Sequence, residues 1–538
     1  MYKLVLFFLL VFSASQAQQF TRKDSLKGGL PFERLCYDVK KYSLNIQLNP
    51  AQKSIQGLNT IKFAVLQPTK RIQLDLFANM QIDSITLDQY ALPYTREFDA
   101  VFVDFSTELT PQTPEYTLQF YYHGQPQVAL NAPWDGGLVF SKDRQGNPFI
   151  GVAVQGDGAS LWFPCKDSQS DEPDRGATVS ITVPSPLVAV SNGRFKGSIQ
   201  TSFNQTRWDW EVKNPINAYD ITLYVGDFVH FGETYKGLDL DYYVLRDNEA
   251  KAKTQFAGVK PMLDCFQEKF GPYPFAADGY KLVEAPYLGM EHQSAVAYGN
   301  GYQNGYLGSD LSGTGKGLLF DFILVHESGH EWFGNSITAK DVADMWIHEG
   351  FTCYSESVYL ECQYDKETAL TYLNGLKKNV KNDKPIIGSY GVKNEGSGDM
   401  YYKGALLLHT IRSYINDDER WWQLIKEFST TYTHQIIDTQ TVIDFFSKQS
   451  GLALAPIFNQ YLRHKELPIL EWKLANNKLS YRWNCAEKAF NLPATLVIKG
   501  KAVRVYPNKT WKSKGIKKVT KKDIQVKDTD FYILSKGL

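Results

Sequence analysis

The chain has 538 residues, of which 43% are hydrophobic and 22% charged, and its 58 basic and 58 acidic residues give a formal net charge of zero. This length exceeds what one hydrophobic core can organise, so we expect about three domains. The balanced charge and ordinary composition argue against nucleic acid or an anionic membrane surface as a partner, and against a long disordered segment.

The first seventeen residues have the pattern of a secretory signal peptide. Lys3 precedes the apolar run LVLFFLLVF, and the small residues from Ala14 to Ala17 form a cleavage site that places the first mature residue at Gln18. The apolar run is too short to span a bilayer, and no other long apolar run occurs. We therefore expect residues 1–17 to be removed and the mature protein to be exported, either to a periplasm or to the outside.

Three domains of a multidomain α+β fold are predicted for the rest of the chain. Residues 18–235 contain short alternating runs such as YSLNIQLNP and ATVSITVP, which predict an N-terminal antiparallel β domain. Residues 236–465 carry helical patterns such as WWQLIKEF and TVIDFFSKQ, which indicate a mainly helical catalytic domain. Residues 466–538 return to strand patterns and predict a small C-terminal β domain, whose many lysines we interpret as solvated side chains on protected edge strands.

The most informative motif is the pentapeptide His326-Glu327-Ser328-Gly329-His330. Residues four apart lie on one face of a helix, so both imidazoles can reach a single cation. Glu327 is then placed to take a proton from water that the metal activates. The flanking residues are apolar, lack proline and reach a helix stop at Gly334-Asn335. The alternative is a buried helix with two purely structural histidines.

A third metal ligand is predicted in a second helical pattern, MWIHEGFTCYSESVYLE. Glu349 follows His330 after eighteen intervening residues. Two His and one Glu with an open fourth position are a standard zinc set for peptide hydrolysis, so we predict one Zn²⁺ ion on His326, His330 and Glu349. Spacing alone also allows other acidic residues. Glu356, two helical turns after Glu349, is either an exposed glutamate or a carboxylate that orients one of the two histidines.

Together these segments resemble a known family. HESGHEWFGN followed by HEGFTCYSE resembles the gluzincin aminopeptidases of the aminopeptidase N and leukotriene hydrolase type, whose pattern reads HExxH, usually WFGN, then NEGFAxYxE. Upstream, APYLGMEHQSAVAYG resembles the GxMEN loop of that family, with His292 in place of the usual Asn. The resemblance runs from about residue 36 to about 465. It implies an N-terminal β saddle and a thermolysin-like catalytic domain.

The resemblance also implies residues that bind the substrate. Glu291 would hold the protonated α-amine, so that only the first peptide bond reaches the metal, and the Gly289 and Met290 backbone would bind the substrate main chain. Counting back nine residues from Pro164 nominates Gln155 as a second contact to the amine. His292 leaves the anchor intact but puts the packing of the loop and the first-residue preference in question.

An oxyanion donor is implied by the same comparison. The family signature Tyr-x-Lys-Gly matches the run that ends at Gly404, which assigns the hydroxyl that stabilises the tetrahedral oxyanion to Tyr401. A shift of one residue would move this role to Tyr402. Many relatives carry a long helical C-terminal domain that caps the site, and the roughly 70 residues after position 465 leave no room for one. We therefore expect a more open site, or one closed by a partner chain.

Cysteine and the other histidines are predicted to be structural. Six cysteines in a chain of this length are too sparse for a disulfide scaffold, and most are expected to be buried free thiols. Cys353 and Cys362 would lie about 13 Å apart along one helix, which is too far to bridge. His348 and Glu331 should face away from the metal.

The predicted function is that of a zinc-dependent aminopeptidase acting on peptides with a free N-terminus. A zinc endopeptidase would share the metal site but would tolerate a blocked N-terminus. A non-catalytic peptide-binding protein on the same fold is a further alternative, which the intact metal and base positions disfavour. Epoxide hydrolysis, an activity of one branch of the family, has no specific support. The sequence does not determine the first-residue preference or the oligomeric state.

Overall fold

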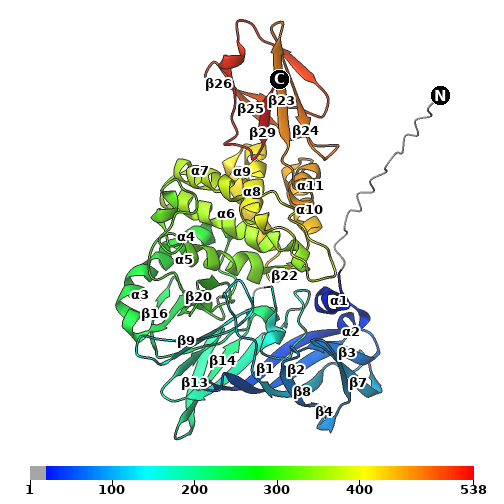
Figure 1. Cartoon of the computed structure of the whole chain (residues 1–538), viewed down its shortest axis with the longest axis vertical. Coiled ribbons are helices and arrows are strands. Elements are labelled where there is room, and N and C mark those ends of the chain that lie inside the picture. Colours follow the sequence, from blue (N-terminus) through cyan, green and yellow to red (C-terminus); the bar gives the residue numbers. More distant parts are fainter. Residues whose placement is uncertain (1–19, 155) are drawn as a thin grey trace, which may run out of the picture.

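The computed structural model describes residues 20–154 and 156–538, so the predicted signal peptide and Gln155 lie outside the described residues. Three parts follow one another along the long axis in Figure 1: β layers, then helices, then a small β domain at the far end. This order confirms the predicted multidomain α+β fold. In the described ranges, no helix has the length and apolarity needed to cross a membrane.

The N-terminal part begins with helices α1 (Arg22–Gly28) and α2 (Phe32–Leu35) and continues with strands. These are β1 (Tyr37–Asn49), β2 (Ser54–Val65), β3 (Thr69–Asp75), β4 (Met80–Leu87), β5 (Tyr90–Ala91), β6 (Tyr94–Glu97), β7 (Ala100–Leu109), β8 (Tyr116–Gly124), β9 (Gly137–Lys142), β10 (Pro148–Ala153), β11 (Ala177–Pro184), β12 (Val188–Val190), β13 (Arg194–Ser202), β14 (Gln205–Val212) and β15 (Tyr224–Gly226). They form an eight-stranded sheet, β13-β14-β11-β1-β2-β8-β4-β5, and two smaller sheets, β12-β15-β10-β9 and β3-β7-β6. Nearly every pair is antiparallel, as predicted, but β1 and β11 pair in parallel.

A further sheet joins the two large parts of the molecule. It has the order β16 (Phe228–Tyr235), β17 (Leu238–Leu245), β18 (Tyr280–Glu284), β20 (Val296–Tyr298) and β19 (Gly289–Met290). Successive side chains on a strand point to opposite faces. In β20, Val296 and Tyr298 therefore enter the core of the helical part, whereas Ala297 enters the N-terminal core. The predicted boundary after residue 235 falls in the turn between β16 and β17, within this shared sheet.

The helical part is built from α3 (Glu249–Gln255), α4 (Val259–Phe270), α5 (Phe322–Gly329), α6 (Trp346–Gln363), α7 (Lys366–Gly375), α8 (Tyr402–Ile415), α9 (Asp418–Thr431), α10 (Thr439–Ser450) and α11 (Ala455–Leu462), with a small parallel pair, β21 (Ile337–Ala339) and β22 (Gln435–Ile437). The two helices predicted around the metal ligands are α5 and α6. The Asp321 side chain caps α5 by accepting a hydrogen bond from the Leu324 N–H at 3.2 Å. A π-helical turn follows and opens at Gly334 (φ 134°), which confirms the predicted stop.

One disulfide is present among the described residues, between Cys265 of α4 and Cys362 near the end of α6, with Cα atoms 5.9 Å apart. The other four cysteines are free thiols and three of them are buried, so half of the six, and not most of them, are the buried free thiols that were predicted. Cys353 and Cys362 do not pair, as their helical separation predicted. The sequence could not reveal the partner of Cys362, because Cys265 lies 97 residues away.

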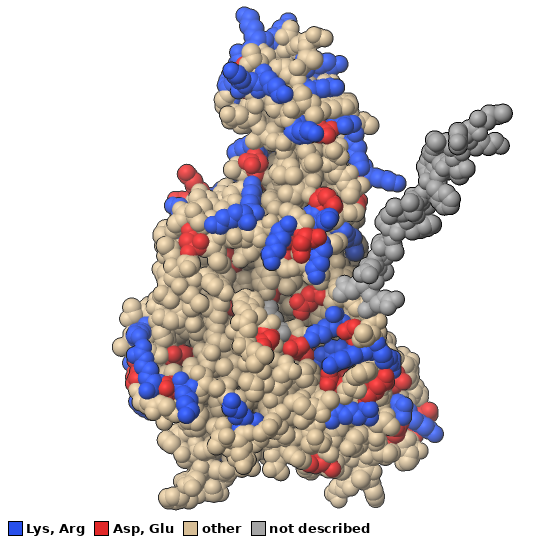
Figure 2. Space-filling model, in the orientation of Figure 1, with Lys and Arg blue, Asp and Glu red and all other residues tan. Residues whose placement is uncertain are grey.

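The C-terminal part has β23 (Ile469–Ala475), β24 (Lys478–Asn484), β25 (Ala494–Ile498), β26 (Lys501–Val505), β27 (Lys512–Gly515), β28 (Ile524–Val526) and β29 (Leu534–Gly537), in sheets ordered β27-β24-β23-β29 and β26-β25-β28. Its apolar side chains continue the core of the helical part. The lysines between positions 512 and 522 are exposed, and β27 is an edge strand, as the sequence predicted. Lys and Arg side chains gather around this end of the molecule in Figure 2.

Candidate metal centre and active site

Close contacts between helices bring the site residues together. A Cβ on Gly329 of α5 would lie 2.5 Å from the Ser355 hydroxyl of α6, so only glycine allows these helices to approach so closely. Gly350 of α6 and Gly404 of α8 face each other in the same way, with a Cβ on Gly404 only 2.8 Å from the Gly350 Cα. The glycines inside the motifs are therefore packing residues that align α5, α6 and the start of α8.

The predicted metal ligands converge in this contact. His326 Nε2 lies 3.7 Å and His330 Nε2 3.4 Å from Glu349 Oε2. One ligand atom from each of the three residues lies within 4.8 Å of the others, and all three side chains are buried. Two imidazole nitrogens and one carboxylate oxygen at this separation match the donor set of a catalytic zinc site. The residues present therefore fit one zinc ion.

Neighbouring side chains orient both histidine ligands. His326 Nδ1 lies 2.7 Å from Glu356 Oε1, and the other oxygen of Glu356 accepts a hydrogen bond from the Tyr372 hydroxyl at 2.6 Å. His330 Nδ1 lies 3.0 Å from the Phe333 carbonyl oxygen. Each ring thereby turns its Nε2 toward Glu349. Of the two sequence interpretations of Glu356, the structure supports the buried orienting carboxylate and assigns it to His326.

Burial and charge act against each other in this cluster. Burial alone would lower the pKa of His326, but the Glu349 and Glu356 carboxylates outweigh it and raise that pKa above its ordinary value. Burial would raise the pKa of Glu349, whereas the two neighbouring imidazoles lower it below its ordinary value. Burial raises the pKa of Glu327 to about 7. The cluster is thus a crowded set of buried ionisable groups of the kind that a bound cation stabilises.

Glu327 and Glu291 line the same cavity as the metal ligands. This cavity measures about 380 Å³ and is also lined by Trp134, Phe322 and Tyr401. Glu291 and Glu327 each offer an oxygen within 4.8 Å of one another and of a His330 nitrogen. A Cβ on Gly289 would lie 2.7 Å from Glu327 Oε1, so glycine at this position leaves room for the proposed base. The structure therefore brings the predicted base and the predicted amine anchor together beside the metal ligands.

The loop that carries Glu291 is an edge strand held by buried contacts. Residues Gly289 and Met290 form β19, which pairs only with β20 among the described strands and leaves its other backbone edge available to a peptide. The Asn335 amide donates to the Glu291 carbonyl oxygen at 2.7 Å. Glu331 accepts a hydrogen bond from the Ser294 N–H at 2.8 Å. Sequence reasoning missed both positioning roles, although Asn335 stands in the WFGN run that carries the resemblance.

His292 does not line the cavity. Its ring is fully buried, and its Nδ1 lies 2.7 Å from the Tyr224 hydroxyl of the N-terminal part. It therefore packs the loop against β15. The substitution of the usual Asn changes this contact and leaves the Glu291 side chain in the cavity.

Tyr401 and Tyr402 both line the cavity that contains the metal ligands, Glu291 and Glu327, which we call the metal-side cavity. Tyr401 precedes α8, and its ring lies nearly parallel to the His326 ring, with centroids 6.3 Å apart. Burial, together with Cys353 and Glu356, raises the pKa of Tyr402 above its ordinary value. The position of Tyr401 over a metal ligand suits an oxyanion donor, and its assignment over Tyr402 stays a prediction.

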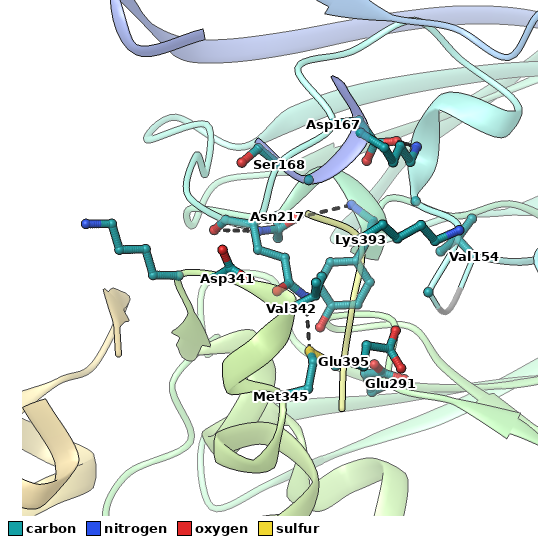
Figure 3. A pocket seen from close by; sticks show the side chains of 17 residues that line it. Val154, Asp167, Ser168, Asn217, Glu291, Asp341, Val342, Met345, Lys393 and Glu395 are labelled. Atoms are coloured by element: carbon teal, nitrogen blue, oxygen red, sulfur yellow. Dashed lines mark hydrogen bonds and ion pairs between the residues drawn. The ribbon is translucent and has the colours of Figure 1, made fainter. Parts of the chain in front are cut away.

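A second cavity meets the first at Glu291, and Figure 3 shows its lining. Val154, Gly156 and Gly158 line it, so the residues on both sides of position 155 border this space. Gln155 itself lies outside the described residues, and its contact to the substrate amine stays a prediction.

The histidines predicted to be structural lie outside the metal cluster. His348 accepts a hydrogen bond from the Ala339 N–H at 2.7 Å, which confirms that it faces away from the metal. The others contact carboxylates or carbonyl oxygens: His123 with Asp83, His230 with Asp241, His409 with Thr529, His434 with Pro274 and His464 with Glu487.

A buried His-His-Glu set, with a further glutamate between the two histidines in an HExxH sequence, is typical of metallopeptidase sites. The chain belongs to the peptidase M1 family, because the M1 N-terminal domain matches residues 38–219 and the M1 domain matches residues 255–461. Together these matches cover most of the described chain and include every predicted metal ligand.

Similarity to characterised proteins supports this family membership. Tricorn protease-interacting factor F2 of Thermoplasma volcanium is 23% identical over 64% of this chain and 44% of its own length. Endoplasmic reticulum aminopeptidase 1 of Rattus norvegicus is 22% identical over 70% of this chain and 42% of its own. Aminopeptidase M1-B of Oryza sativa subsp. japonica is 22% identical over 82% and 52%. The chain thus spans about half the length of these relatives.

Solved structures agree on the fold. An M1 zinc metallopeptidase from Deinococcus radiodurans superimposes with a TM-score of 0.68 at 20% sequence identity, covering 82% of this chain and 96% of that chain. A variant of that protein bound to a Tyr-Ser-Ala substrate gives the same TM-score. At this identity the likeness establishes the fold alone.

The Glu356 contact predicts a change in metal affinity. Replacing Glu356 with Gln keeps the shape of the side chain but removes the anionic partner of His326 Nδ1, so we expect zinc to bind about 10- to 100-fold more weakly. Competition with a chelator measures this. The matched control is Tyr372→Phe, which removes one hydrogen bond from the same carboxylate and should weaken zinc less. Unchanged affinity in a folded Glu356→Gln protein would contradict the orienting role.

Proposed function

We propose that the protein is a zinc-dependent aminopeptidase that hydrolyses the first peptide bond of peptides with a free N-terminus. One observation carries the proposal: a buried carboxylate, Glu291, shares a cavity with the metal ligands and with Glu327. Glu291 Oε1 has no hydrogen-bond partner among the described residues. A buried acceptor of this kind requires a donor, and a peptide ammonium group supplies one together with the opposite charge.

Binding of the substrate amine at Glu291 determines which peptide bond reacts. With the α-ammonium group on Glu291, the first carbonyl group lies toward the metal ligands, because only two bonds separate the amine nitrogen from that carbon. The free edge of β19 supports the peptide main chain on the same side. Internal bonds of a longer peptide are then too far from the ligands to react.

The chemical step is divided among three groups. When bound, zinc supplies a Lewis acid that polarises the carbonyl and makes water a nucleophile near neutral pH. Glu327 takes the proton of the attacking water on a carboxylate oxygen and then donates it to the leaving amine nitrogen. The Tyr401 hydroxyl donates a hydrogen bond to the oxygen that becomes negative in the tetrahedral intermediate.

The test of the function uses one peptide in two forms, with its N-terminus free or acetylated. We expect the purified protein to remove residues one at a time from the free peptide and to leave the acetylated peptide intact, as followed by mass spectrometry. Internal cleavage of both forms would instead indicate an endopeptidase. No cleavage of either form by zinc-loaded protein would indicate a peptide-binding protein.

Replacing Glu327 with Gln tests the base. Gln cannot accept a proton from water, so we expect kcat to fall by about 10²- to 10⁴-fold, with zinc content unchanged because Glu327 is not one of the three ligands. Turnover of the free peptide and metal analysis of the same preparation provide the two measurements. Substantial remaining turnover would exclude Glu327 as the base.

Export of the mature protein is part of this proposal. The pattern of residues 1–17 predicts it, and the Cys265–Cys362 disulfide supports it, since such bonds persist mainly in oxidising compartments. N-terminal sequencing of the protein recovered outside the cytoplasm of an expressing cell should begin at Gln18. An unprocessed Met1 would contradict the export prediction.

A further inference from the structure

A second cavity meets the metal-side cavity at Glu291, and we call it the amine-side cavity. It is lined by residues from segments far apart in the sequence, among them Tyr219, Val342, Met345 and Glu395. The α-amine and the side chain of a peptide's first residue are attached to the same carbon. Given the proposed function, the first side chain of a substrate held at Glu291 is within reach of the amine-side cavity, because Glu291 is part of its lining.

Glu395 has no cation of its own in this cavity. Within the described ranges it makes no hydrogen bond or ion pair, and Figure 3 shows that Glu395 and Glu291 line the same cavity. Burial raises the pKa of Glu395, and the nearby carboxylates of Glu349, Asp157 and Glu291 add to this effect against a single opposing lysine, Lys393. A carboxylate in such surroundings is stabilised by a positive group that enters with the ligand.

The lysines around the cavity are already engaged or exposed. Lys393 forms an ion pair with Asp157, and Lys27 of α1 pairs with Asp167 at 2.5 Å and donates to the Ser160 hydroxyl at 2.9 Å. Lys340, the remaining lysine of the lining, is exposed to solvent. Among the lysines of the described lining, Lys393 is thus the one whose charge acts on Glu395, and its ion pair is with Asp157.

Other polar groups also line this cavity. The Tyr219 hydroxyl and Gln169 Oε1 are buried and have no hydrogen-bond partner among the described residues, and both residues line the cavity. Together with the Glu395 carboxylate, they present oxygen atoms that can accept hydrogen bonds from a ligand. A guanidinium or ammonium group brings several donors and a positive charge at once.

The apolar part of the lining suits an unbranched side chain. Val154, Val342 and Met345 supply apolar surface along which an unbranched methylene chain can pack. A methylene stem with a cationic end matches the apolar residues and the carboxylates of this lining.

The loop of Glu395 is held in place by contacts on both sides. The Gly391 N–H donates to Asp341 at 2.8 Å, and the Tyr390 hydroxyl donates to Asp344 at 2.7 Å. From the other side, Gly28 of α1 packs so closely on the Val392 backbone that a Cβ there would lie 2.2 Å from the Val392 carbonyl carbon. These contacts hold the loop that carries the Glu395 carboxylate.

We propose that the amine-side cavity selects substrates whose first residue is lysine or arginine, and that Glu395 is the specificity-determining residue. The inference rests on the proposed aminopeptidase function and adds a substrate class to it. The methylene stem of the first residue packs on the apolar wall, and its cationic end pairs with Glu395.

The experiment compares four aminoacyl amides with one leaving group: arginyl, citrullyl, alanyl and glutamyl. Citrulline has the shape of arginine without its charge. We expect kcat/KM for the arginyl substrate to exceed that for the citrullyl substrate by about 10- to 100-fold, the range for hydrogen bonds to a charged group. Glu395→Gln should reduce this ratio toward 1, and Glu395→Lys should favour the glutamyl substrate. The control is Glu268→Gln, which removes a carboxylate that is 69% exposed and should keep the ratio.

The outcomes separate this inference from the proposed function. Cleavage of the alanyl and citrullyl substrates at least as fast as the arginyl one would leave an aminopeptidase but overturn the selection by Glu395. An equal loss on all substrates in Glu395→Gln, with the arginine-to-citrulline ratio retained, would reduce Glu395 to a structural role. No cleavage of any substrate by zinc-loaded protein would overturn the proposed function and this inference with it.

Discussion

The structure depends on placing two imidazoles and several carboxylates inside an apolar core. Ionised groups out of water are costly unless opposite charges and hydrogen bonds surround them. His326, His330 and Glu349 meet this requirement by sharing one position for a cation, and Glu356 and the Phe333 carbonyl oxygen use the remaining ring nitrogens. Glu291 Oε1 has no hydrogen-bond partner among the described residues, and the proposed substrate amine would supply one.

The surrounding fold keeps this cluster in register. Glycines at the helix contacts allow α5, α6 and α8 to pack within van der Waals distance, so ligands from different helices meet without long side chains. The shared five-stranded sheet belongs to both cores, and its edge strand β19 delivers Glu291 to the junction between them. The site therefore lies where the β-rich and helical parts are packed together, and a shift between them would move the amine anchor relative to the base.

Two features lie next to the metal centre. His292 turns away from the cavity to the Tyr224 hydroxyl, so the departure from the usual Asn is absorbed by packing between domains. The loop of Glu395 and the N-terminal helix α1 close the amine-side cavity, and α1 lies before the matched M1 N-terminal domain. Variation in such peripheral segments can alter which first residue is accepted while the metal ligands and base stay in place.

The sequence by itself predicted the metal ligands, the base, the helices that carry them and the order of the β-rich, helical and C-terminal β parts. The pairing of His326 with His330 and the strand patterns depend on local spacing, whereas Glu349 was selected by the resemblance to a known family. Only the tertiary structure decided that Glu356 orients His326, that Cys265 pairs with Cys362, that Asn335 and Glu331 hold the Glu291 loop, and that Glu395 lines the amine-side cavity. Each of these contacts joins residues that are distant along the chain. The sequence contains many carboxylates, amides and thiols that could make such contacts. The packing of whole helices and sheets selects the ones that meet, and no local sequence pattern encodes that packing.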